Sequence, residues 1–235
     1  MPPTGDLSKQ AILARTPLFA GLTPAELDTI SVMTRLVRLK KQEPLFYKGD
    51  PGDALYVVVQ GVVRISTVSA DGRETVLNLM NAGQIFGEIA ALDGGERTAD
   101  AIAMGEVELL ALDRRNLLTF LRSNPEGCIR MLATVCGRLR WVSELLDDAN
   151  YLELPARLAK RLLLLSKSFG QMTAEGLRIS LKLSQQELAT HMSASREAIN
   201  RQFKHWTDEG VIAVDSGHVI IRDEPALSRC VDAGE

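Results

Sequence analysis

Several residue types that mark common classes of protein are scarce in this chain of 235 residues. The three cysteines, Cys128, Cys136 and Cys230, show neither the pattern of a disulfide framework nor the spacing of a metal site. No apolar run is long enough to span a membrane, and the start, Met-Pro-Pro-Thr-Gly-Asp, does not resemble a signal peptide. We therefore expect a cytoplasmic protein without disulfides, without a metal site and without a membrane partner.

The chain also lacks the basic surplus of proteins that bind nucleic acids through their overall charge. Its formal net charge is −3. Residues 1–152 hold 16 Lys and Arg against 19 Asp and Glu, and residues 153–235 hold 11 of each. Any DNA-binding surface must therefore be a local patch. The hydrophobic fraction of 46% is enough for one large or two modest domains with buried cores.

The apolar pattern of the first half predicts helices followed by strands. Residues 8–30 are typical of short helices, with Thr23 as an N-cap before Pro24. From about residue 34 to 113, short β-branched runs are separated by Gly and Asp, and Asp71-Gly72 predicts a hairpin turn. This spacing favours a rolled antiparallel β domain. The clearest predicted strands are 37–40, 45–47, 54–59 and 62–67.

The stretch from Gln84 to Ala101 has the residues of a pocket for a small anion. Gly87 lets the backbone approach a ligand closely, and a short helical turn can follow it. Arg97 offers a planar fork of donors that suits a phosphate, and Thr98 adds a hydroxyl. Glu88 is an acceptor for ligand hydroxyls such as those of a ribose. The alternative is a bulged strand, a turn and a surface arginine.

Helices return after the strands, and one of them is long. It is predicted from near Pro125 to about Asp148, where Asn150 breaks the pattern and a hinge spans 147–153. Its apolar residues recur at alternating spacings of three and four, which indicates a coiled-coil seam and a homodimer. A helix packed on its own β domain would give a similar stripe. The predicted interface residues are Leu132, Val135, Leu139, Val142 and Leu146, with Ala149 continuing the stripe.

The last third of the chain predicts a winged helix-turn-helix. A helix over 154–168 ends at Gly170, and a short strand follows at 179–181. A capping box at 184–187 starts a helix that runs to about His191, and after a tight turn Ser195 caps a second helix over 196–208. Two apolar runs, 211–214 and 218–222, predict a hairpin, hence a wing.

The second of these helices carries residue types that read DNA bases. Arg can bind guanine with two hydrogen bonds, and Glu can accept one from cytosine. The alternative is a solvated amphipathic helix. The candidate DNA-binding residues are Ser184, Gln185, Ser195, Arg196, Glu197, Asn200, Arg201 and Lys204.

The order Phe-Gly-Glu, eight residues, then Arg-Thr-Ala resembles the phosphate-binding cassette of cyclic-nucleotide-binding domains. With the long helix and the helix-turn-helix behind it, the chain resembles the Crp/Fnr family of bacterial transcription regulators over about residues 15–223, most closely its cyclic AMP receptor protein branch. The resemblance implies an α+β fold. Its parts would be an N-terminal antiparallel β-roll cyclic-nucleotide-binding domain (1–125), a dimerisation helix and hinge (126–152) and a C-terminal winged helix-turn-helix domain (153–235).

The same resemblance implies the roles of individual residues. Glu88 would bind the ribose 2′-hydroxyl, while Arg97 and Thr98 would bind the cyclic phosphate. That branch usually has Thr-Ser where this chain has Val142-Ser143, so the effector stays open between cyclic AMP and cyclic GMP. The DNA site would be a TGTGA-like palindrome, and RNA polymerase would be a partner. The implied ligand-binding residues are Phe86, Gly87, Glu88, Ile89, Ala90, Arg97, Thr98, Ala99, Val142 and Ser143.

Other functions are disfavoured by missing residues. No cysteine precedes Cys128, which excludes the iron–sulfur sensor of this family. The first histidine is His191, so the β domain has no histidine to bind haem. No nucleophile–base pair or metal-ligand cluster is recognisable, so we expect no enzyme. The remaining alternative is a regulator of the same family that binds DNA without a nucleotide or responds to another small effector.

Overall fold

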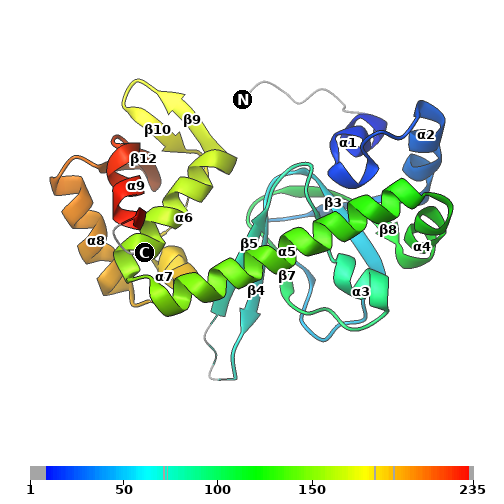
Figure 1. Cartoon of the computed structure of the whole chain (residues 1–235), viewed down its shortest axis with the longest axis horizontal. Coiled ribbons are helices and arrows are strands. Elements are labelled where there is room, and N and C mark those ends of the chain that lie inside the picture. Colours follow the sequence, from blue (N-terminus) through cyan, green and yellow to red (C-terminus); the bar gives the residue numbers. More distant parts are fainter. Residues whose placement is uncertain (1–8, 71, 73, 183, 193, 233–235) are drawn as a thin grey trace. The chain divides into compact units, whose positions relative to one another are not determined.

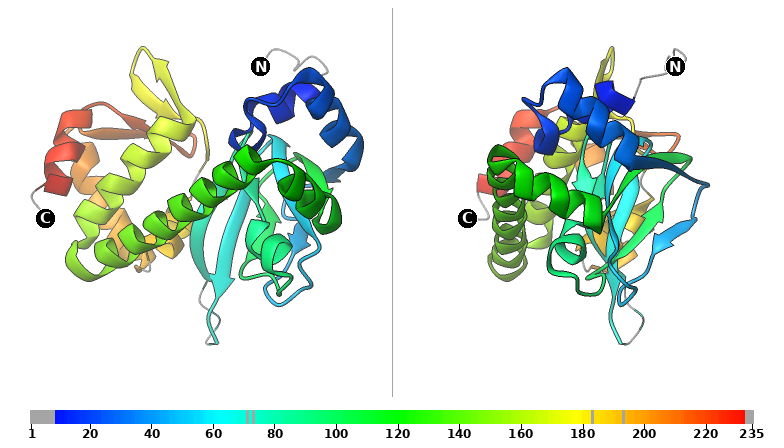
Figure 2. Two further views of the ribbon diagram at one scale, coloured as in Figure 1. Left: turned by 45° about the vertical axis from the view of Figure 1, so that its right-hand side comes forward. Right: turned by 90° about the vertical axis from the view of Figure 1, so that its right-hand side faces the viewer.

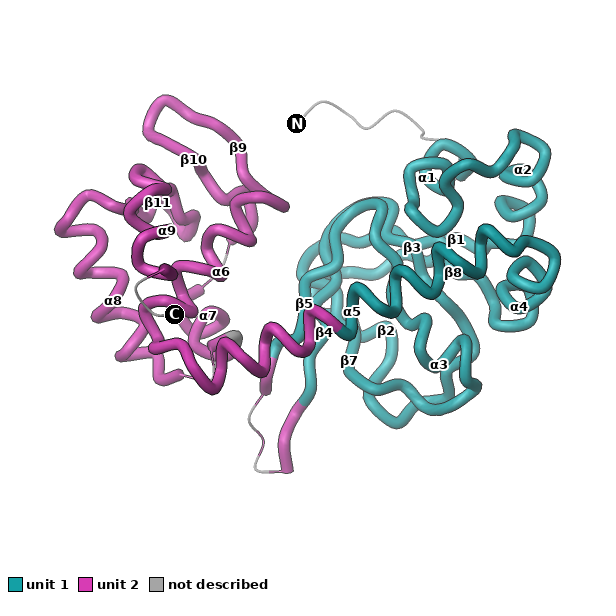
Figure 3. Tube along the Cα trace, in the orientation of Figure 1, with its two compact units in different colours: residues 1–67, 76–139 teal, residues 68–75, 140–235 magenta. Residues whose placement is uncertain are grey.

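The computed structural model describes residues 9–70, 72, 74–182, 184–192 and 194–232. The chain divides into two compact units, residues 1–67 with 76–139 and residues 68–75 with 140–235 (Figure 3). The long helix α5 (Pro125–Tyr151) contributes to both units. The fold is α+β, as the sequence predicted: an antiparallel β domain is followed by α5 and then by a helix-turn-helix with a small sheet (Figure 1).

Two four-stranded sheets form the centre of unit 1. Their strand orders are β1-β8-β3-β6 and β2-β7-β4-β5. β8 pairs antiparallel with both β1 and β3, and β7 pairs antiparallel with both β2 and β4. β4 and β5 are neighbours, as the predicted hairpin required, although Asp71 of its turn lies outside the described residues. The strands are β1 Thr34–Leu39, β2 Pro44–Phe46, β3 Ala54–Gln60, β4 Val63–Val68, β5 Glu74–Met80, β6 Ile85–Phe86, β7 Asp100–Ala103 and β8 Val107–Asp113.

Short helices surround these sheets. In Figures 1 and 2, the blue helices α1 and α2 lie together above the sheets, away from α3. The helices are α1 Lys9–Arg15, the 3₁₀ helix η1 Pro17–Phe19, α2 Pro24–Met33, α3 Glu88–Asp93, α4 Arg114–Ser123 and the first part of α5.

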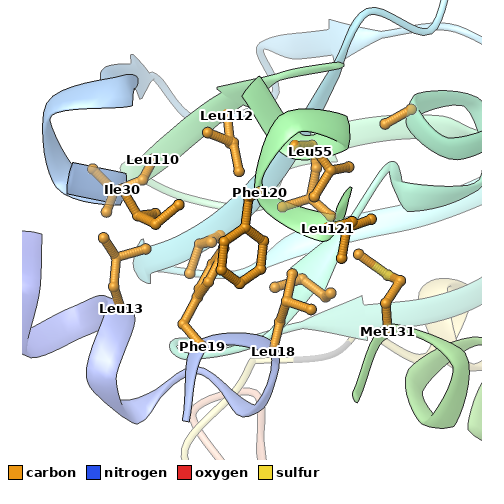
Figure 4. Packing of buried hydrophobic residues seen from close by; sticks show 14 of the residues in the cluster. Leu13, Leu18, Phe19, Ile30, Leu55, Leu110, Leu112, Phe120, Leu121 and Met131 are labelled. Carbon is orange, nitrogen blue, oxygen red and sulfur yellow. The ribbon is translucent and has the colours of Figure 1, made fainter. Parts of the chain in front are cut away.

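Alternate residues of β3 belong to two different cores. Leu55 and Val57 pack with Phe19 of η1 and Phe120 of α4, whose rings lie 5.5 Å apart (Figure 4). Tyr56 and its neighbours on the other face fill the space between the two sheets. A strand buried on both faces has a continuous apolar sequence, which is why residues 54–59 are recognisable as a strand. The core between the sheets also forms one wall of the site described below.

Unit 2 packs helices around a four-stranded sheet of order β11-β12-β10-β9. The yellow β9–β10 hairpin projects from the helices of this unit in Figures 1 and 2. The buried side chains include Leu158, Leu162, Ile199, Phe203, Trp206 and Ile220. The elements are α6 Leu154–Phe169, β9 Gly170–Thr173, β10 Gly176–Ile179, α7 Gln185–Met192, α8 Arg196–Asp208, β11 Ile212–Asp215, β12 His218–Ile221 and α9 Glu224–Asp232.

Side-chain caps begin the helices where the sequence predicted them. Thr23 and Glu26 form a reciprocal capping box at α2, with N···O distances of 3.4 and 2.8 Å. Ser184 and Glu187 do the same at α7, with distances of 3.1 and 2.7 Å. The hydroxyl of Ser195 accepts a hydrogen bond from the first turn of α8. Each cap satisfies backbone N–H groups that have no partner within the helix.

The structure corrects two expectations about helix ends. α5 does not end near Asp148 but continues through Asn150 to Tyr151, and the N–H of Leu152 still bonds to the carbonyl of Asp148 at 3.1 Å. Gly170 is the C-cap of α6 as predicted, but its backbone is extended at φ −74° and starts β9. A Cβ there would lie 2.1 Å from a backbone oxygen of α6, which explains the glycine.

Strand and helix positions near the C-terminus also differ from the expectation. The strand predicted at 179–181 is β10, which ends at Ile179 and pairs with the unpredicted β9. Helix α9 was not predicted either. Its signal is Asp223, whose side chain accepts a hydrogen bond from the N–H of Ala226 at 2.9 Å, in the manner of an N-cap.

Candidate functional site

A glycine in a left-handed conformation connects β6 to α3 at the centre of the predicted pocket. Gly87 has φ 77°, a backbone conformation that other residues adopt only with strain. A Cβ at this position would lie 2.8 Å from Nη1 of Arg97 and 3.2 Å from the carbonyl oxygen of Ala54. The glycine is therefore required both for the turn and for the close approach of Arg97, whereas the sequence predicted only a close approach of the backbone to a ligand.

The residues around this turn line a cavity of about 50 Å³. All the predicted residues of 86–90 and 97–99 contribute to it. Three further lining residues, Phe46, Ile65 and Arg138, were not among the predicted ligand contacts. Val142 and Ser143 belong to unit 2, and their part in the site stays a prediction.

Arg97 is not the surface residue of the alternative interpretation, since only 4% of it is exposed. Its Nη1 donates hydrogen bonds to the carbonyls of Ala54 at 2.9 Å and Gly87 at 3.0 Å. Its Nη2 lies 3.7 Å from a carboxylate oxygen of Asp53, beyond hydrogen-bond reach. Its Nε is buried and finds no acceptor among the described residues. The edge of the guanidinium formed by Nε and Nη2 thus makes no hydrogen bond with the part of the chain that the structure describes.

Glu88, at the start of α3, is also buried, with 1% exposed. Nε of Arg138 lies 3.0 Å from Oε1 of Glu88, while Nη2 of Arg138 donates to the carbonyl of Ile85. The contact with Glu88 is an ion pair without hydrogen-bond geometry, and within the described chain neither carboxylate oxygen accepts a hydrogen bond. Glu88 and Arg97, two buried and oppositely charged residues, therefore line the same small cavity.

Burial dominates the ionisation of this pair. Burial raises the pKa of Glu88, and the positive charge of Arg138 opposes that shift only in part. Burial likewise lowers the pKa of Arg138, against the attraction of Glu88. For both groups, the loss of hydration outweighs the attraction between the two charges.

Helix α8 in unit 2 separates an apolar face from a charged one. Ile199, Phe203 and Trp206 are buried, and this anchors the helix in unit 2. Hydrogen bonding to its own backbone N–H, and then to Ser195, lowers the pKa of Glu197 and favours the carboxylate form that accepts hydrogen bonds. The exposed predicted DNA contacts are Ser184, Ser195, Arg196, Glu197, Arg201 and Lys204.

Two predicted DNA contacts are only half exposed. Gln185 is half-buried in the first turn of α7. Asn200 is half-buried too, and its side-chain oxygen lies inside without a hydrogen-bond partner in the described residues. Beyond α8, the two-residue turn of the wing has positive φ at Ser216 (49°) and Gly217 (83°), which is the geometry of a tight hairpin.

Large apolar side chains on α5 are exposed along the predicted seam. Leu132, Leu139, Val142 and Leu146 are each 50–68% exposed, and Val135 is half-buried. A helix that packed this stripe against its own β domain would bury these residues. The stripe is thus available to another surface, as a dimer would require.

Comparison with protein families assigns both units. Residues 36–124 match the cyclic nucleotide-binding domain, and residues 156–230 match the Crp-like helix-turn-helix domain. The chain is 33% identical over 218 residues to a CRP-like cAMP-activated global transcriptional regulator of Mycobacterium tuberculosis, covering 93% of this chain and 97% of that protein. It is 37% identical over 214 residues to the cyclic AMP receptor protein of Thermus thermophilus, covering 90% of this chain and 95% of that protein.

The chain belongs to the Crp/Fnr family. It is therefore a DNA-binding transcription regulator with a cyclic-nucleotide-binding domain, and the family is not enzymatic. The fold agrees with the solved structure of FixK2 from Bradyrhizobium japonicum, with a TM-score of 0.76 at 18% identity over 84% of this chain and 96% of that one. In the described part of this Crp/Fnr protein, no helix has the length and apolarity needed to cross a membrane.

Three lining residues of this Crp/Fnr site, Phe46, Ile65 and Arg138, were not predicted from the sequence. Arg138 lies on α5, fifty residues after Glu88, and no local pattern connects it to the cassette. Phe46 and Ile65 come from β2 and β4, and nothing in their local sequence connects them to Arg97. Only the pairing of β7 with both strands brings them to the pocket.

The raised pKa of Glu88 predicts a pH dependence of stability. Between the ordinary value of 4.5 and the raised pKa, the folded chain retains a proton that the unfolded chain has lost. The contribution of Glu88 to the free energy of unfolding therefore falls as the pH rises from 4.5 to the raised pKa. In urea titrations from pH 4 to 8, Glu88→Gln should gain stability relative to the wild type as pH rises, until Glu88 is ionised. A difference that does not change with pH would contradict the raised pKa.

Proposed function

We propose that this Crp/Fnr regulator is a homodimer that binds a cyclic nucleotide in the cavity of unit 1 and a palindromic, TGTGA-like DNA site through α8. The observation that carries the effector is a set of buried groups that have no hydrogen-bond partner among the described residues and belong to residues lining one cavity: Nε of Arg97 and both oxygens of Glu88. Leaving such a group buried without a partner costs about 1–3 kcal/mol. An anionic ligand that also carries hydroxyl donors would satisfy all of them.

A cyclic nucleotide has both features. Its phosphate oxygens suit the planar edge of Arg97, and its ribose 2′-hydroxyl suits Glu88. Two relatives support this class by name, the cAMP-activated regulator of M. tuberculosis and the cyclic AMP receptor protein of T. thermophilus. The cavity of about 50 Å³ is smaller than usual ligand pockets of about 300–1,000 Å³, so its walls must part as the nucleotide enters.

Cyclic AMP is the proposed first effector, with cyclic GMP weaker. Both share the ribose and phosphate, so the purine alone discriminates between them. Ser143 can donate or accept a hydrogen bond, whereas Val142 can do neither. One hydrogen bond is worth about 0.5–1.5 kcal/mol, so we expect the two affinities to lie within about two orders of magnitude.

The proposed mechanism is a shift between two arrangements of the dimer. Ligand in the cavity favours one arrangement of α5, which sets the two α8 helices about one DNA turn apart. The ligand acts only through its different affinity for the two states. A regulator of this kind works in the bacterial cytoplasm, where the chromosome lies, with RNA polymerase as its further partner.

Arg97→Ala tests the effector site. Losing a charge-assisted hydrogen bond of about 1.5–3 kcal/mol should weaken cyclic AMP binding by about ten- to a hundred-fold, as measured by titration calorimetry. Arg115→Ala removes an exposed arginine of α4 outside the cavity and should leave the affinity unchanged. A folded Arg97→Ala variant that binds cyclic AMP with wild-type affinity would contradict the proposed site. Selective DNA binding by a wild type that binds neither nucleotide would support the alternative regulator without a nucleotide effector.

Leu139→Asp tests the dimer. It places two carboxylates opposite each other in an apolar interface, so sedimentation should show monomers. Ala133→Asp adds the same charge at an exposed position of α5 outside the seam and should remain dimeric. A Leu139→Asp protein that sediments as the wild-type dimer would rule out the seam.

Arg196→Ala and Arg201→Ala test base recognition. Each should cost about 1–3 kcal/mol of DNA affinity and relax the preference at one G·C pair of the half-site. Lys204→Ala is the contrasting variant, because a phosphate contact weakens all DNA sequences alike. Selection from a random DNA pool gives the site for each variant. A non-palindromic wild-type site, or uniform losses in the arginine variants, would count against this reading of α8.

A further inference from the structure

Aromatic residues are few in this chain, yet three of them gather around Arg97. They make up 5% of the sequence. The centre of the Arg97 guanidinium lies 4.3 Å from the ring centroid of Phe46 and 5.5 Å from that of Tyr56. Tyr56 in turn stacks on Phe86, with centroids 5.4 Å apart and planes 22° apart. The ring of Phe46 lies within 6.2 Å of both other rings, so the three form one aromatic cluster.

This cluster takes the place that a buried carboxylate usually has beside a buried arginine. Among the described residues, the acid that pairs with Arg97 is Asp53, which is 83% exposed and 3.7 Å away, so water screens it. Glu88 lies in the same cavity but forms its ion pair with Arg138. A carboxylate held against Arg97 would cancel its charge and occupy its donors. An aromatic face attracts the cation without accepting any of its in-plane hydrogen bonds.

We propose that Phe46 is a positioning residue for the anion site, and the role of that anion rests on the proposed function. The ring of Phe46 holds the flat face of the Arg97 guanidinium, while the carbonyls of Ala54 and Gly87 hold Nη1. These two constraints fix the plane and the rotation of the group. The edge with Nε and Nη2 can then donate hydrogen bonds to the phosphate of the ligand, and its positive charge attracts that phosphate. Phe46 thus sets phosphate affinity by orienting Arg97.

A packing role for Phe46 has to be separated from this one, because Phe46 also belongs to the core between the sheets. Phe46→Leu keeps an apolar side chain but removes the π face. Arg97→Lys keeps the charge but removes the planar group that stacks. If Phe46 acts through Arg97, substituting Phe46 lowers the cyclic AMP affinity only when Arg97 is present. If Phe46 only packs in the core, its substitution should cause the same loss of cyclic AMP affinity in the wild type and in the Arg97→Lys variant.

The experiment is a double-mutant cycle on the full-length protein, with cyclic AMP titrated by calorimetry. Phe46→Leu should weaken binding by about tenfold, within the range of a partly desolvated cation–π contact. In the Arg97→Lys background the same change should have less than about a twofold effect. Phe46→Tyr keeps the ring and should bind within about twofold of the wild type. Phe120→Leu, an equivalent change in the other core of unit 1, is the matched control and should bind normally.

A second measurement needs no nucleotide. In NMR spectra of the ligand-free protein, the Arg97 Nε–H signal, assigned by its loss in Arg97→Lys, should move and broaden in Phe46→Leu but not in Phe120→Leu. An unmoved signal, or equal losses of cyclic AMP affinity with and without Arg97, would overturn the role of Phe46. A wild type that binds no cyclic nucleotide but shows the NMR effect would overturn the proposed effector and keep the positioning role.

Discussion

The guanidinium of Arg97 is almost fully buried, and much of unit 1 is arranged to keep it there. Burying a cation costs free energy unless its charge and its donors find partners. The carbonyls of Ala54 and Gly87 accept hydrogen bonds from Nη1 of the guanidinium, and the ring of Phe46 packs against one of its faces. The left-handed turn at Gly87 allows this approach, because a Cβ would meet the guanidinium at 2.8 Å. What remains is an edge without a hydrogen bond in the described residues, and the proposed anionic effector would complete it.

The second charge in the cavity connects the pocket to the long helix. Glu88 is paired with Arg138 of α5, yet both of its oxygens lack hydrogen bonds in the described residues. The directions of the pKa shifts of Glu88 and Arg138 show that burial outweighs their attraction. A ligand hydroxyl that donates to Glu88 would stabilise its carboxylate form. It would thereby change the ion pair between Glu88 and Arg138. Because α5 also carries the exposed apolar seam, this ion pair would connect the proposed effector to the proposed dimer interface.

The DNA-binding unit depends on a simpler principle, the separation of an apolar and a charged face along one helix. Ile199, Phe203 and Trp206 are buried and fix α8, while Arg196 and Arg201 are left in solvent. The net charge of the chain plays no part in this arrangement, since acidic and basic residues balance in the C-terminal part of the sequence. We therefore propose that specificity comes from a few side chains of α8 rather than from a general attraction to DNA.

Local sequence determined the features whose physics is local. The caps at Thr23, Ser184 and Ser195 could be predicted, because each depends on neighbours within a few residues. The family resemblance added the cassette and the order of the domains. Tertiary structure alone decided that Phe46 of β2 lies against Arg97 and that Glu88 pairs with a helix fifty residues further along the chain. Such contacts depend on strand order and on the packing of α5, and no periodicity within a short window of sequence encodes either.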